Sequence, residues 1–147
     1  MVLIGTRNIA TQTVLTDGAI SLGSVYRKYC KRNSCGVRAF ETTADSILLQ
    51  HQGIYHLTAT FVGTGTVAGD VTVQLLENGI AIAGALSTET ITTATTEIRT
   101  FVIDHYILVD DACLLGKNTT LSKAITFQNT GVGATFTAVT VNIEKVV

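Results

Sequence analysis

Hydrophobic and polar residues alternate with a period of two along much of the chain. In the clearest example, which opens at Gly53, Tyr55, Leu57, Ala59 and Phe61 are separated by histidine and threonine. Successive side chains of a strand point to opposite faces, so this pattern predicts a strand with one buried and one polar face. No segment of ten or more residues shows a helical spacing of apolar positions. The same alternation appears at Val71, Val73 and Leu75, at Phe101, Ile103, Ile107 and Val109, and at Val139, Val141 and Ile143.

Two dipeptides predict tight hairpin turns between strands. Asp17-Gly18 lies between two β-branched runs, and Asn78-Gly79 interrupts the alternating segment "DVTVQLLENGIAIAG". Both dipeptides tolerate the positive φ angles that a two-residue hairpin turn requires. We therefore expect a small N-terminal hairpin and a second hairpin in the middle of the chain. Turn signals recur about every ten residues, which predicts an all-β, antiparallel jelly-roll sandwich of about six to eight strands.

The distribution of charge divides the chain. The 147 residues carry a net charge of −1, but residues 1–40 contain six basic residues and one acid, whereas residues 41–147 contain ten acids and four basic residues. A basic segment favours an acidic partner. We predict a basic N-terminal arm, residues 1–36, with its short hairpin, attached to a jelly-roll body, residues 37–147.

Targeting signals are absent from the sequence. No apolar run approaches the ~20 residues that a membrane-spanning helix needs. The start "MVLIGTRNIATQT" lacks the charged start followed by an apolar stretch that is typical of a secretory signal. The sequence therefore predicts no membrane association, and any route out of a cell would need no signal, as in cell lysis.

Three segments carry a resemblance to a known family: "FETTADSILLQHQGIYHLTATF", "VTVQLLENGIAIAG" and "GATFTAVTVNIEKV". They resemble the trimeric jelly roll shared by tumour-necrosis-factor-like and complement-like globular heads, and most closely its phage and bacterial surface versions. The shared pattern is a Gly-x-Tyr strand, an L-x-x-N-G hairpin and a hydrophobic last strand, and it covers roughly residues 37–147. One departure is "VDDACLLG", where the family often has a Gly-Asp pair before a late strand.

The resemblance implies a homotrimer and a structural role in a phage particle. The threonine face of the strand after Gly53 permits such packing, because threonine offers both a methyl and a hydroxyl group to a neighbour. The candidate trimer interface is His56, Thr58 and Thr60. We expect a non-enzymatic virion protein, either a capsid decoration or a head fibre, made in the bacterial cytoplasm, with the chain itself and a capsid protein as partners.

A different class of function stays open: a receptor- or carbohydrate-binding head of a tail fibre or a bacterial surface protein. Its binding loops would need aromatic or polar clusters, but "GTGTVAG" and "NTGVGA" consist mainly of small residues and contain no aromatic residue. An enzyme is not predicted, since the chain has no Gly-x-Ser-x-Gly elbow and no close cluster of metal ligands. No cofactor is expected.

The stretch "YRKYCKRNSCGVRAF" is the densest cluster of charge. It places five basic residues around Cys30 and Cys35. Docking to an acidic protein surface fits these residues better than nucleic acid, because the whole chain is slightly acidic; a solvated loop is the alternative. The two cysteines are free thiols, a disulfide or part of a zinc site. Free thiols are favoured, because a zinc site usually needs four ligands and a disulfide would require oxidation that a bacterial cytosol opposes. The docking candidates are Arg27, Lys28, Lys31, Arg32 and Arg38.

The remaining chemistry-bearing residues are scattered. Asp104 and His105 are neighbours on one predicted strand, so they face opposite sides and do not form a pair. His56 could meet its symmetry mates at a trimer axis and bind an ion, although an interface histidine is the usual case. The other candidates are His51, Asp110 and Asp111 for a metal, Cys113 as a buried apolar residue, and Asn118 in a glycosylation pattern.

Overall fold

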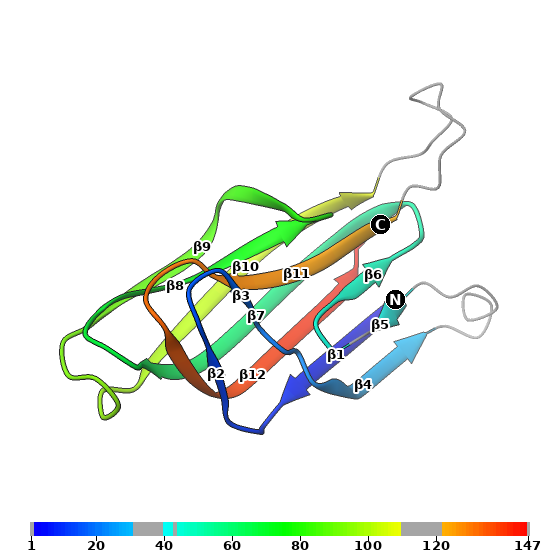
Figure 1. Ribbon diagram of the computed structural model, residues 1–147. Helices are drawn as coiled ribbons and strands as arrows, with labels where there is room; N and C mark the ends of the chain where they lie inside the picture. Colours follow the sequence, from blue (N-terminus) through cyan, green and yellow to red (C-terminus); the bar gives the residue numbers. More distant parts are fainter. Residues whose placement is uncertain (1, 31–39, 43, 110–121, 147) are drawn as a thin grey trace.

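The computed structural model describes residues 2–30, 40–42, 44–109 and 122–146. In this part of the chain there are twelve strands and no helix. The strands form two antiparallel sheets that pack face to face (Figure 1). The prediction of an all-β antiparallel sandwich is confirmed, but the predicted number of six to eight strands is wrong, since the described residues form twelve. No helix of the described residues is long and apolar enough to cross a bilayer.

Sheet A has the strand order β10-β7-β12-β1-β4, and β2 pairs with β12 outside this path. Sheet B has the order β5-β6-β11-β8-β9, and β3 pairs with β11. The strands of sheet A are β1 (Val2–Asn8), β2 (Gln12–Val14), β4 (Ser24–Cys30), β7 (Gly53–Gly65), β10 (Arg99–Val109) and β12 (Ala134–Lys145). The strands of sheet B are β3 (Gly18–Ala19), β5 (Phe40–Thr42), β6 (Ile47–Leu49), β8 (Gly69–Glu77), β9 (Ile80–Ile91) and β11 (Lys123–Asn129).

The core lies between the two sheets and is built from the predicted alternating faces. Tyr55, Leu57, Ala59 and Phe61 of β7 are all fully buried. The apolar positions predicted on β8, β10 and β12 are buried as well. Each of these four strands therefore buries one face in the core and turns the other outward, as the period of two requires.

The second predicted hairpin is confirmed. Asn78 and Gly79 have φ angles of 52° and 78°, and the flanking residues Glu77 and Ile80 pair directly across β8 and β9. Positive φ at both central positions is the requirement that selects Asn-Gly for this turn.

The first predicted hairpin is wrong, although its turn exists. Asp17 has a φ of 63°, and the amide of Gly18 donates to the carbonyl of Leu15 at 2.9 Å. However, β2 pairs with β12 in sheet A, whereas β3 pairs with β11 in sheet B. The turn is therefore a corner between the sheets. Burial decides this path, because Val14 before the turn and Ile20 after it both lie in the core.

The described part of the predicted arm packs as part of the sandwich. β1 lies between β12 and β4 and forms antiparallel pairs with both strands. Ile4 and Leu22 of this segment are buried in the core. The boundary at residue 36 lies outside the described residues, so the division into an arm and a body stays a prediction.

Candidate interaction surface

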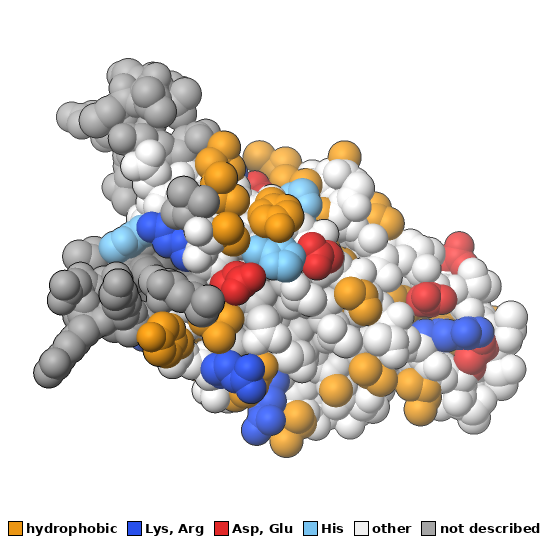
Figure 2. All heavy atoms as spheres, turned by 180° about the vertical axis from the view of Figure 1, so that it is seen from behind, with side chains coloured by type: hydrophobic (Ala, Val, Ile, Leu, Met, Phe, Trp, Pro, Cys, Tyr) orange, Lys and Arg blue, Asp and Glu red, His pale blue; other side chains and the backbone are white. Residues whose placement is uncertain are grey.

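The outward side of sheet A carries apolar, acidic and basic side chains together (Figure 2). The strand registers define this surface, which we call the outer face of sheet A. One row across the strands joins Tyr106, His56, Glu144, Leu3 and Tyr29; the next joins Asp104, Thr58, Asn142, Gly5 and Arg27; a third joins Val102, Thr60, Thr140 and Arg7.

Apolar side chains dominate the outer face along β10, one of the two edge strands of sheet A. Val102, Tyr106 and Leu108 are 52%, 61% and 50% exposed. They occupy alternate positions of one strand, and Asp104 lies between two of them. Scattered exposed apolar residues are ordinary, but a contiguous patch indicates contact with another molecule. Tyr106 and Leu108, together with Ile54 on β7, which pairs with Leu108, form such a patch, and Asp104 separates Val102 from it.

His56 lies between two carboxylates on this face. Its Nε2 is 2.9 Å from Asp104 Oδ1, and its Nδ1 is 3.4 Å from Glu144 Oε1. Its ring stacks on that of Tyr106, with the centroids 4.8 Å apart. The hydrogen bond with Asp104 raises the pKa of His56 above the usual histidine value, Glu144 adds to the increase, and desolvation opposes it. We call His56, Asp104 and Glu144 the histidine cluster; Figure 2 shows a histidine with an acidic side chain on either side.

The histidine cluster is not arranged as a metal site. Each ring nitrogen of His56 contacts a different carboxylate. The two nitrogens of an imidazole point in different directions, so the carboxylates do not converge with one nitrogen on a single ion. Among the described residues, no three histidine, cysteine, aspartate or glutamate side chains are grouped to hold a metal.

A second cluster, which we call the arginine cluster, lies on β1 and β4. The ring of Tyr26 has the guanidinium carbon of Arg7 at 5.1 Å and that of Arg27 at 5.4 Å from its centroid, both within cation–π range. The Tyr26 hydroxyl donates to Asn142 Oδ1 at 2.9 Å. In the part of the chain that the structure describes, neither guanidinium has a carboxylate partner.

The arginine cluster depends on two local features. The register between β1 and β4 shifts so that Gly5 pairs with Arg27 and Thr6 with Val25, which leaves Tyr26 as the extra residue of a β-bulge. A Cβ at position 5 would lie 2.9 Å from Tyr26 Cε1 and 2.6 Å from Asn142 Oδ1. Glycine at this position therefore leaves the space in which the tyrosine ring lies.

A depression of about 310 Å³ joins the two clusters. Arg27 and Glu144 both line it, yet they do not form an ion pair with each other. The lining residues are Leu3, Arg27, His56, Thr58, Asn142 and Glu144.

Sequence comparisons find no relatives: no protein-family model matches the chain, and no curated protein matches it. Solved structures do match. The globular domain of zebrafish complement 1qA covers 100% of this chain and 98% of its own, with 6% identity and a TM-score of 0.63. The Eiger TNF of S. frugiperda covers 100% and 94%, with 8% identity and a TM-score of 0.66. The PRD1 vertex protein P5 covers 99% and 97%, with 12% identity and a TM-score of 0.54.

The chain has the TNF/C1q-like jelly-roll fold. The fold expected from the resemblance is thereby confirmed. At these low identities the comparisons establish the fold alone.

The TNF/C1q-like sandwich brings some of the predicted site residues together. His56, Thr58 and Thr60 share the outer face of sheet A with Arg27, which was predicted to belong to a separate docking site. Lys28 is exposed and points to the other side of β4, because it pairs with Ile4, whose side chain lies in the core.

Other predicted residues lie elsewhere or are not described. Asp104 contacts His56 and not the adjacent His105, as the strand geometry predicted. The side chain of Cys30 lies outside what the structure describes. So do Lys31, Arg32, Cys35, Arg38, Asp110, Asp111, Cys113 and Asn118.

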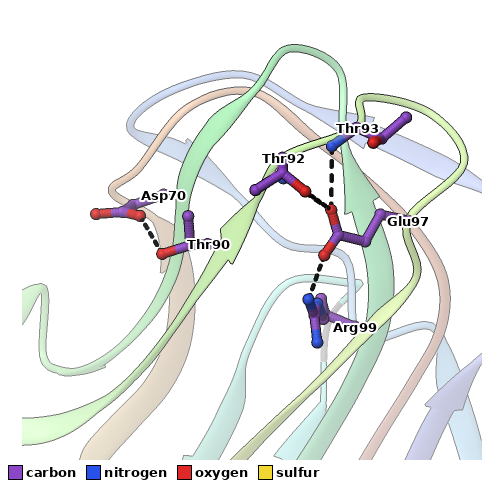
Figure 3. Close-up of polar contacts among 6 residues, drawn as sticks. All are labelled: Asp70, Thr90, Thr92, Thr93, Glu97 and Arg99. Atoms are coloured by element: carbon purple, nitrogen blue, oxygen red, sulfur yellow. Dashed lines mark hydrogen bonds and ion pairs between the residues drawn. The ribbon is translucent and has the colours of Figure 1, made fainter.

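The carboxylate of Glu97 closes the turn between β9 and β10 (Figure 3). Glu97 Oε2 accepts from the amides of Thr92 and Thr93 at 2.7 and 3.0 Å and from the Thr92 hydroxyl at 2.8 Å. Glu97 Oε1 accepts from Arg99. These donors hold the pKa of Glu97 at about 2, so the carboxylate has a structural role in the turn.

The contacts of Glu97 predict a turn that resists acid. The pKa of Glu97 is lowered on folding, so its contribution is present above the ordinary glutamate value and is lost as the pH falls through about 2. Hydrogen exchange should show protected Thr92 and Thr93 amides at pH 4. The variant Glu97→Ala removes the oxygen that accepts from both amides, so the Thr92 and Thr93 amides should lose protection at pH 4. Equal protection in both proteins would contradict the role of Glu97.

Proposed function

We propose that this chain is a non-enzymatic structural protein of a phage particle, a capsid decoration or head-fibre protein. It self-associates as a homotrimer through the outer face of sheet A and docks on the capsid through its basic segment. The fold supports this proposal, because it is found in a vertex protein of phage PRD1 as well as in the TNF and complement 1qA domains.

The exposed apolar patch on β10 is the observation that carries self-association. A contiguous apolar patch on an exposed face of a sheet indicates contact with another molecule. Here Val102, Tyr106 and Leu108 are at least half exposed on one face. Burying them against a second copy removes apolar surface from water, and closed symmetric oligomers are the common outcome of such contacts. The predicted interface residues His56, Thr58 and Thr60 line the adjacent strand of this face.

Docking is assigned to Lys28, which points away from this face, and to the basic residues that follow it in the sequence. Lys28 is exposed on the other side of β4 from Arg27. In the sequence it is followed closely by Lys31, Arg32 and Arg38. We therefore place Arg27 in the self-association surface and keep the other four residues as the candidates for contact with an acidic capsid surface.

The oligomeric state tests the first half of the proposal. Size-exclusion chromatography with light scattering should give a mass near three times the 15.6 kDa of the chain. A monomer at micromolar concentrations would contradict the homotrimer.

Capsid docking is tested with substitutions, because removing residues 1–36 would also remove β1 and β4 from sheet A. The variant Lys28→Glu/Lys31→Glu/Arg32→Glu should keep the mass of the wild type. Its co-sedimentation with capsids should fall at least about tenfold, since reversing rim charges places like charges opposite each other. Undiminished co-sedimentation would remove the docking role.

The alternative, a receptor- or carbohydrate-binding head, finds less support in the loops. Backbone hydrogen bonds tie the 66–68 connection to the 130–133 connection: Thr66 N donates to Gly133 O, and Val132 N donates to the carbonyl of Asp70 in β8, each at 2.9 Å. The side chains of these connections are small and offer few groups that could bind a glycan. Specific binding on a glycan array would reverse this preference.

A further inference from the structure

We propose that each copy places its arginine cluster on the histidine cluster of the next copy, so that Arg7 and Arg27 pair with Asp104 and Glu144 across the contact. This inference rests on the proposed self-association and names the chemistry of its contact. The contact is heterologous: every copy offers a basic half on β1 and β4 and an acidic half on β7, β10 and β12 of the same face. Such contacts close into a ring when the rotation between copies permits it.

The basic half is organised to receive carboxylates. Arg7 and Arg27 lie near one aromatic ring, and the hydroxyl of that ring is fixed by Asn142. A guanidinium near a ring keeps its planar set of N–H donors available for a carboxylate. Two like charges beside one ring repel each other, and in the described part of the chain no acidic side chain compensates them. A carboxylate from outside would relieve this repulsion.

The acidic half keeps free capacity for such donors. The side chains of Asp104 and Glu144 are 59% and 42% exposed, although each contacts His56. A carboxylate has two oxygens and accepts several hydrogen bonds, so each acid can bind a guanidinium as well as the imidazole. Figure 2 shows basic side chains below the histidine and its acidic neighbours on the same face.

A second copy of this chain fits the face better than a free anion. A free anion would satisfy the arginines but would leave the exposed apolar side chains of Val102, Tyr106 and Leu108 in water. A second copy brings carboxylates for Arg7 and Arg27 and at the same time covers apolar surface. Complementary charges of this kind favour one register between copies and speed their encounter.

The same geometry makes the contact sensitive to pH. The titratable and charged groups that face His56 are Asp104 and Tyr106 from β10, Glu144 from β12, and Arg27 across the depression from β4. A proton on His56 compensates the two carboxylates that the arginines of the next copy would bind. Protonation of His56 and binding of the next copy therefore weaken each other, and by linkage the effect is the same in both directions.

The direction of the pH effect follows from the titration of His56. Its pKa is raised above the ordinary 6.5, so the imidazole becomes charged as the pH falls from 8 toward 6. We expect the association constant to fall at least about fivefold over that interval. In the variant His56→Gln this dependence should be flat between pH 6 and 8, because glutamine does not titrate.

Charge reversal tests the pairing directly. We would measure the mass by light scattering at pH 8 for four proteins: the wild type, Arg7→Glu/Arg27→Glu, Asp104→Arg/Glu144→Arg, and the chain with all four substitutions. Each double variant should weaken association at least about a hundredfold, because like charges then face each other. The fourfold variant exchanges the two halves and should regain the wild-type mass. Circular dichroism would confirm that every variant is folded.

The controls are Lys28→Glu, on the same strand as Arg27 but on its other side, and Asp45→Arg, an exposed acid outside sheet A. Both should keep the wild-type mass. If the wild type is trimeric and the double variants are too, the pairing proposed here is wrong while self-association stands. If the fourfold variant stays dissociated, the pairing is also wrong. A monomeric wild type overturns the pairing together with the proposed trimer.

Discussion

Replacing Phe61 by alanine is expected to lower the free energy of unfolding by about 3–5 kcal/mol. Phe61 of β7 is fully buried and packs edge-on against Phe127 of sheet B, with ring centroids 5.1 Å apart. It also contacts Phe136 of β12 at 6.1 Å, and Phe136 contacts Phe101 of β10 at 6.0 Å. Phe61 therefore joins the two sheets at the centre of the core. Its loss leaves a cavity that rigid strands on both sides cannot fill.

The measurement is equilibrium unfolding in guanidinium chloride at one fixed protein concentration, because self-association adds to the apparent stability. The matched control is Phe61→Leu, which keeps most of the apolar volume and should lose about 1–2 kcal/mol. If Phe61→Ala lost less than about 1 kcal/mol, the aromatic cluster would not be a central element of the fold.

The position of Phe61 in the core could be predicted because alternation is a local property of the chain. The corner at Asp17-Gly18 shows where local information ends. The turn itself forms as its residues predict, but the partners of the flanking strands are β12 and β11, which lie more than a hundred residues away in the sequence. The pairing of these strands depends on the buried surface available to Val14 and Ile20, and no local sequence pattern indicates it.

The candidate surface could be predicted only as far as local alternation reaches. The period of two places His56, Thr58 and Thr60 on one outward face, and the structure agrees. The partners of His56 are Asp104 and Glu144, which are 48 and 88 residues away, so only the strand registers bring them together.

Arg7 was missed because it is an isolated basic residue in "GTRNIA", far from the basic stretch. The bulge that places Tyr26 near both arginines arises from a register shift opposite Gly5. The glycine between the β-branched residues Ile4 and Thr6 was the available signal, since glycines inside a strand often mark a bulge or a close approach.

Asn129 is the residue whose replacement should have the second-largest effect. It is fully buried, and its Nδ2 donates to the carbonyls of Val14 and Val132 at 3.2 and 2.8 Å. Its Oδ1 accepts from the amide of Gly131 at 3.1 Å. The side chain therefore ties the end of β2 to the turn between β11 and β12. The substitution Asn129→Leu keeps a similar volume but leaves buried carbonyl and amide groups without their partner, which should cost about 2–4 kcal/mol.

The neighbouring residue supplies a matched control. Gln128 makes a single side-chain bond of the same kind, from Nε2 to the carbonyl of Asp17 at 2.9 Å, at an exposed site. Water can replace that bond, so Gln128→Leu should lose less than about 1 kcal/mol. Unfolding in denaturant gives both values, and hydrogen exchange should show lost protection of the Gly131 amide only in Asn129→Leu. Equal stabilities of the two variants would mean that water satisfies the groups around Asn129. The conformation of the segment "NTGVGA" would then be set by the backbone hydrogen bonds from Thr130 and Val132 to β8, and not by the side chain of Asn129.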